Sequence, residues 1–177
     1  MSWIESVQNT ADWYAANINA YGNKSFECSL EHAGRVRADC SGFVSCCLRI
    51  AGIIKENETY GSSSYADTTG VCADALRAAG FEPYPYSFEI IRPFDIIALS
   101  GHVEIFYHKY GRSGLSYAWG NNHNVSRGGL PCWMTKKKYK IIWRCMSEQD
   151  AIDRMMFAKL GCVSSESEEE SEKNIKK

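Results

Sequence analysis

Hydrophobic residues recur every three or four positions in the first half of the chain, a spacing typical of helices. The pattern predicts a first helix over residues 2 to about 19, a second that begins at Cys40 and ends at Gly52, and a third over about 66–79. Residues 55–70 are polar and glycine-containing, so we expect a loop around that segment.

The second half of the chain has the pattern of strands. Residues 96–99 form a short apolar run, and residues 102–107 alternate as a half-buried strand does. Further strands are predicted over residues 115–119 and 139–143, followed by a helix over 147–160. Because helices come first and strands later, the sequence predicts an α+β fold with N-terminal helices packed on a small antiparallel sheet.

The length of the chain, 177 residues, suits one domain with a sizeable core. We expect this domain to cover residues 1–160. Residues 161–177 are mostly serine, glutamate and lysine and form an acidic, flexible tail in this interpretation. A net charge of −1 and the lack of a long apolar run give no reason to expect nucleic acid or a membrane as a partner.

The first residues, Met1–Glu5, lack the basic and apolar regions of a signal peptide, so we expect synthesis and folding in a cytoplasm. For that reason we expect the eight cysteines to be reduced thiols rather than disulfides. Cys46 and Cys47 are expected to be buried and structural. No C-x-x-C pair is present, and we expect neither a metal nor another cofactor.

Cys40 stands at the start of its predicted helix, directly after Asp39, a good N-cap residue. Unpaired backbone N–H groups give that end a partial positive charge, which favours thiolate over thiol and makes a better nucleophile. Ser41 and Gly42 are small enough to let a substrate carbonyl approach, and the Cys40 N–H could help to hold its oxyanion.

A cysteine nucleophile needs a base, normally histidine. His102 begins a strand directly after a glycine, at a strand end where sites are usually built. Taken alone, it could equally be a half-exposed strand histidine. His32 and His108 fall in predicted loops or turn edges, where we expect them to be solvated.

The residue that orients the base is predicted from the register of a hairpin. If residues 109–114 are the turn, His108 faces Leu115 and His102 lies opposite Asn121. Directly opposed residues have Cβ atoms about 4.5–5.5 Å apart, close enough for an amide oxygen to accept from an imidazole.

Other assignments of the third residue stay open. A register slip of one residue would present Asn122 or Gly120, a modest loop change would bring His123 within reach, and the asparagines could equally be plain turn residues. Glu104 is a further candidate, because residues two apart on a strand share a face.

Three segments in this order resemble motifs of one family: Asp39–Val44, Arg92–Ile97 and Gly101–Tyr107. They are similar to the NlpC family of papain-like cell-wall cysteine peptidases, and the resemblance covers about residues 20–145. It implies a papain-like fold with Cys40 as the nucleophile and His102 as the base.

Members of this family typically cleave peptide bonds in peptidoglycan stem peptides, often beside D-glutamate and without a cofactor. The resemblance therefore implies a peptidoglycan peptide as the substrate. Tyr21 is similar to a tyrosine upstream of the family's nucleophile and joins Asp39, Ser41 and Gly42 as a substrate-binding candidate. The chain has Phe94 where the family's turn motif usually has glycine, and asparagines where the third polar residue is often histidine.

Two other functions stay open at this point. One is an amidase of the CHAP type, which has a similar order of cysteine and histidine but cuts the sugar–peptide amide. The other is a non-catalytic wall-binding or virion structural protein with the same fold. Without an export signal, a wall enzyme would act after release or delivery, as a phage lysin, a tail component or a substrate of a dedicated secretion system does.

Overall fold

The computed structural model describes residues 1–21, 36–110, 115–119, 131–133 and 138–149. The helices are α1 (Trp3–Asn17), α2 (Cys40–Ile50), α3 (Ser62–Tyr65) and α4 (Gly70–Ala78), with the 3-10 turn η2 (Met146–Glu148) after the last strand. The strands are β1 (Ile18–Tyr21), β2 (Val36–Ala38), β3 (Phe81–Pro85), β4 (Ile96–Leu99), β5 (His102–Tyr110), β6 (Leu115–Trp119), β7 (Pro131–Trp133) and β8 (Ile141–Cys145).

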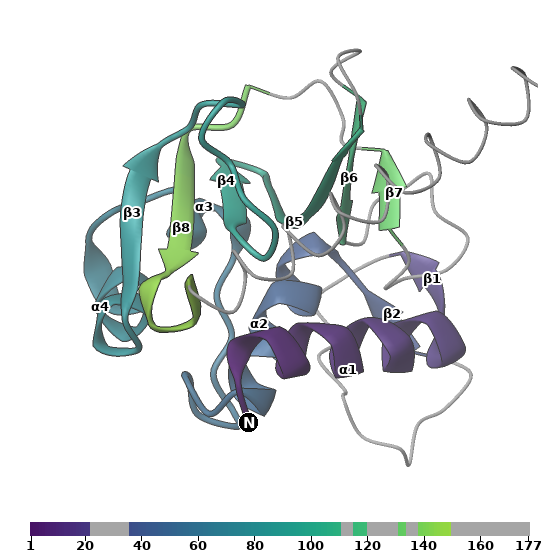
Figure 1. Ribbon diagram of the computed structural model, residues 1–177. Coiled ribbons are helices and arrows are strands. Elements are labelled where there is room, and N and C mark those ends of the chain that lie inside the picture. The colour runs from purple at the N-terminus through teal and green to yellow at the C-terminus, as the bar shows by residue number, and fades with distance from the viewer. Residues whose placement is uncertain (22–35, 111–114, 120–130, 134–137, 150–177) are drawn as a thin grey trace, which may run out of the picture.

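Six strands form one antiparallel sheet in the order β3-β8-β4-β5-β6-β7, and β1 and β2 form a separate parallel pair. Figure 1 shows β8, the last strand in the sequence, between β3 and β4. Helix α1 packs against α2, and α2 packs against β5. The arrangement mixes helices with an antiparallel sheet, as the predicted α+β class requires.

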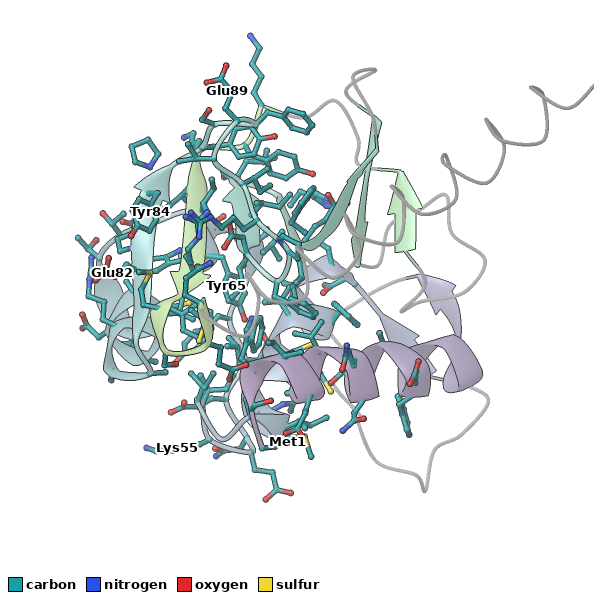
Figure 2. The ribbon with its side chains drawn as sticks, viewed as in Figure 1. Met1, Lys55, Tyr65, Glu82, Tyr84 and Glu89 are labelled. Carbon is teal, nitrogen blue, oxygen red and sulfur yellow. The ribbon has the colours of Figure 1, made fainter. Side chains whose placement is uncertain are left out.

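The two faces of the sheet bury separate apolar clusters, because successive side chains of a strand point to opposite faces. The larger cluster joins the helices to one face and includes Phe43, Leu48, Val103 and Trp143. The smaller cluster covers the other face and consists of Ile91, Ile97, Phe106, Tyr139 and Ile142. In Figure 2, Lys55, Glu82 and Glu89 lie at the edges of the molecule, whereas Tyr65, fully buried, lies inside it.

Helix α1 begins with hydrogen bonds from two directions. Ser2 and Glu5 cap each other, with the Ser2 N–H donating to Glu5 Oε2 (3.1 Å) and the Glu5 N–H to Ser2 Oγ (3.2 Å). The Glu148 carboxylate accepts from the backbone N–H groups of Trp3 (2.5 Å) and Ile4 (3.0 Å). A carboxylate from the far end of the described chain thus satisfies the positive end of this helix.

Helix α2 ends where the glycine signal predicts. Gly52 has a φ of 75°, and its N–H donates to the Arg49 carbonyl at 2.9 Å. The Ile53 N–H donates to the Leu48 carbonyl at 2.8 Å, which completes a Schellman motif.

Phe94 adopts the left-handed conformation, which glycine adopts more freely than residues with a side chain. Its φ is 69°, and its side chain is buried. Its N–H donates to the Phe106 carbonyl at 2.8 Å, and its carbonyl accepts from Trp3 Nε1 at 2.9 Å. Next to it, the buried Asp95 carboxylate pairs with Arg144 at 2.7 Å. These contacts hold the turn that leads into β4.

Several predicted elements differ from the observed ones. Residues 18–21 form β1 rather than the end of the first helix, because they pair with β2, which the local pattern could not reveal. The polar segment 55–70 contains the short helix α3, and α4 starts at Gly70 rather than near residue 66. The strand predicted over 139–143 is displaced by two residues, and β7 was not predicted.

The predicted helix over 147–160 falls mostly outside the described residues, as does the predicted tail over 161–177. The described part of the former begins with a 3-10 turn. Within the ranges that the structure describes, none of the helices has the length and hydropathy needed to cross a bilayer.

Candidate active site

Cys40 is the first residue of α2, as predicted, and its side chain is 5% exposed. Asp39 caps the helix, with Oδ1 accepting from the Gly42 N–H at 2.7 Å and from Ser41 Oγ at 2.8 Å. The Asp39 cap fixes the first turn of the helix and so places the thiol at its positive end.

His102 is the first residue of β5 and is 3% exposed. His102 pairs with Leu99, the last residue of β4, and a two-residue turn joins the two. Gly101 in that turn has a φ of 96°, a conformation that favours glycine. The imidazole is hydrogen-bonded to the thiol of Cys40. The start of a helix and the start of a strand therefore meet, and they bring together the two residues that the sequence predicted as nucleophile and base.

The electrostatics of this pair favour the charged form of both groups. Burial alone would raise the pKa of the Cys40 thiol. The hydrogen bond to His102, the imidazolium charge and a backbone hydrogen bond from Val103 outweigh it and lower that pKa below 9.0, against a smaller opposing effect of the Asp39 charge. A thiol with a lowered pKa is the reactive kind.

Glu104 is the second carboxylate near the pair and is fully buried. Its Oε1 lies 2.8 Å from His102 Nε2, and its Oε2 accepts a short hydrogen bond from the Tyr139 hydroxyl. Burial lowers the pKa of His102, but the hydrogen bonds to Cys40 and Glu104 and their charges raise it from 6.5 to about 9. Because Nε2 lies 2.8 Å from Glu104 Oε1, we assign Nδ1 as the nitrogen that faces Cys40.

These residues form a chain of contacts from Cys40 through His102 and Glu104 to Tyr139. Such a chain can hold a thiolate and an imidazolium side by side at neutral pH, with the carboxylate fixing the tautomer and orientation of the ring. The arrangement can supply the three parts that a cysteine nucleophile site needs, namely a nucleophile, a base and a residue that orients the base.

The register from which Asn121 was predicted is wrong. His108 pairs with Tyr117 rather than Leu115, and a bulge interrupts the ladder between Phe106 and His108. The pairing is therefore shifted by two residues at His108 and by one residue at Ile105, on the His102 side of the bulge. The described ladder ends at Ile105 opposite Trp119. Asn121 itself lies outside the described residues, as do the alternatives at positions 122 and 123.

The predicted substrate-binding residues lie at the start of α2 or beside the strand that leads to it. Ser41 and Gly42 are buried, and both donate to Asp39 in the helix cap. The backbone of Tyr21, the last residue of β1, pairs with Ala38 just before the cap; its side chain lies outside the description.

Tyr139 was missed as a site residue, and Glu104 was ranked behind Asn121. Glu104 carries a signal, because it stands two positions after His102 on the same strand face. Tyr139 carries none, because a single aromatic residue before a strand does not indicate a contact with a carboxylate 35 positions away.

The expectation that all cysteines are reduced is wrong at Cys46, which is disulfide-bonded. Cys47, Cys72 and Cys145 are free and buried, and burial raises the pKa of each thiol, that of Cys72 to about 12. Among the free cysteines with described side chains, Cys40 alone has a lowered pKa.

A surface hollow of about 270 Å³ lies between Ala66, Tyr84 and Lys140 and does not include Cys40 or His102. In the described parts of the chain, no three His, Cys, Asp or Glu residues gather in a way that could hold a metal ion.

Comparisons of the chain with protein-family models, with curated proteins and with solved structures find no match. The resemblance of its three motifs to the NlpC family therefore stays a prediction.

Proposed function

We propose that this chain is a papain-like cysteine endopeptidase that hydrolyses peptide bonds in the stem peptides of peptidoglycan. The observation that carries the chemistry is the hydrogen-bonded pair of Cys40 and His102 at a helix start, with the thiol pKa lowered. The substrate class rests on the three motifs that resemble the NlpC family.

The first half of the reaction forms an acyl-enzyme. The Cys40 thiolate attacks the carbonyl carbon of the scissile peptide bond, and the C–O π electrons move to the oxygen. The Cys40 N–H and the positive end of α2 stabilise that oxyanion. The His102 imidazolium donates its Nδ1 proton to the leaving amine, the C–N bond breaks, and a thioester remains.

The second half restores the resting pair. A water molecule attacks the thioester carbon while His102, now neutral, accepts a proton from that water. The C–S bond breaks, the carboxylic acid leaves, and Cys40 departs as a thiolate beside the imidazolium. Glu104 keeps the ring oriented through both steps, because its Oε1 faces Nε2.

The test is mass analysis of purified peptidoglycan digested by the wild-type chain and by Cys40→Ala. We expect new fragments cut within the stem peptide for the wild type and none for Cys40→Ala. The matched control is Cys72→Ala, because Cys72 is also buried but its thiol pKa is raised to about 12.

The alternative functions would give digestion products of different mass. Release of intact stem peptides from the sugar would indicate the CHAP-type amidase. Unchanged muropeptides with a folded wild-type protein would favour a non-catalytic wall-binding or virion protein. Activity of Cys40→Ala near that of the wild type would exclude a cysteine peptidase of any specificity.

A further inference from the structure

We propose that Tyr139 is a positioning residue of the candidate site, acting through Glu104 to keep the Cys40–His102 pair charged and aligned. This inference rests on the proposed function for its effect on turnover. The effect of Tyr139 on the ionisation of the Cys40 thiol can be measured without a substrate.

The geometry gives each oxygen of the Glu104 carboxylate one close partner. Oε1 faces His102 Nε2 at 2.8 Å, and Oε2 accepts from the Tyr139 hydroxyl. A carboxylate held at both oxygens cannot rotate without losing either the ion pair with His102 or the hydrogen bond from Tyr139. Tyr139 therefore fixes the direction from which Oε1 meets the imidazole.

The Tyr139 hydroxyl matters because the Glu104 carboxylate is buried. Glu104 is fully buried, and Ile97, its partner across the sheet, belongs to the apolar cluster that also contains Tyr139. A buried carboxylate stays ionised only if hydrogen bonds and a positive partner replace its hydration. The Tyr139 hydroxyl supplies one of those bonds, and its loss would leave the charge that faces the imidazolium less well supported.

The titratable groups around this chain of contacts are few among the described residues. His102 and Asp39 act on Cys40, and His102, Tyr139 and Tyr86 lie around Glu104. The ring of Tyr86 packs against that of Tyr139 with centroids 5.2 Å apart. Tyr86 is thus a control for packing, since it neighbours Tyr139 in the same apolar environment.

The experiment compares Tyr139→Phe with Tyr86→Phe. Alkylation of Cys40 by iodoacetamide is followed by peptide mapping over a range of pH, in the full chain. We expect Tyr139→Phe to move the midpoint of alkylation to higher pH, because a weaker imidazolium stabilises the thiolate less. Turnover of peptidoglycan should fall several-fold in kcat with little change in KM. Tyr86→Phe should leave the midpoint in place.

A double variant tests whether Tyr139 acts through Glu104. In a Glu104→Gln background, Tyr139→Phe should add little to the shift, because the charge that it supports is gone. Equal shifts with and without Glu104 would overturn the proposal, as would equal midpoints for Tyr139→Phe and Tyr86→Phe.

A second variant covers the case in which Tyr139→Phe does not fold. Replacing Tyr139 by 3,5-difluorotyrosine keeps the ring and strengthens the donor, so the alkylation midpoint should move to lower pH. An unmoved midpoint would refute the proposal. A shift in a protein that does not cut peptidoglycan would support the role of Tyr139 while removing the proposed substrate.

Discussion

Replacing Glu104 by glutamine tests which residue orients His102. The change keeps the size of the side chain and removes its charge. We expect kcat/KM to fall, and the loss of activity at high pH to begin at a lower pH, because the imidazolium loses its buried counter-charge.

The magnitude follows from the pKa of His102, which rises from 6.5 to about 9. A rise of roughly 2.5 units corresponds to about 3 kcal/mol, at about 1.4 kcal/mol per unit. Cys40 and Glu104 both contribute to this rise, so we assign Glu104 about half, or about 1–2 kcal/mol. The expected loss in kcat/KM is then on the order of tenfold, with the upper pH limb about one unit lower.

The assay is kcat/KM on a soluble stem peptide between pH 5 and pH 10, for the wild type and Glu104→Gln. Glu56→Gln is the matched control, because Glu56 is exposed and lies outside the site. Asn121→Ala is run alongside. An unmoved pH limb in Glu104→Gln together with a large loss in Asn121→Ala would refute the role assigned to Glu104 and return the orienting role to Asn121.

Two further predictions concern the wild-type pH profile and the start of α1. Activity should fall as pH rises through about 9, where His102 loses the proton that the leaving amine needs. It should also fall on the acid side, where the Cys40 thiolate, whose pKa is lowered by His102, takes up a proton. A rate that keeps rising above pH 10 would contradict this prediction. Glu148→Ala should lower the free energy of unfolding in urea by about 1–2 kcal/mol, since two backbone N–H groups of α1 lose their acceptor, whereas Glu89→Ala, at an exposed residue, should change it little.

Local signals predicted the parts of the site that local structure determines. The N-cap Asp39, the helix start at Cys40 and the glycine stop at Gly52 each depend on neighbours within a few positions. The strand over residues 96–99 was predicted with its observed bounds, and so was the one over 115–119. In these segments the hydrophobic pattern and the neighbouring turn or cap residues indicate the same helix or strand.

The errors arose where contacts join distant segments. The register of the hairpin depends on a bulge after Phe106, which alternation alone does not reveal. The strand over 18–21 exists because it pairs with β2, and the disulfide at Cys46 cannot be paired from cysteine spacing. Tyr139 reaches Glu104 only because β8, which follows it, inserts between β3 and β4.

The central place of β8 has a consequence for the order of folding. Both of its neighbours, β3 and β4, are synthesised at least 40 residues earlier, yet neither pairs directly with the other. The sheet therefore cannot close until the chain has reached about residue 145. Such long-range pairing is slow because a large loop must close first. During synthesis Cys40 would emerge well before Tyr139, which stands much later in the sequence, so a nascent chain would first carry Cys40 without the complete site.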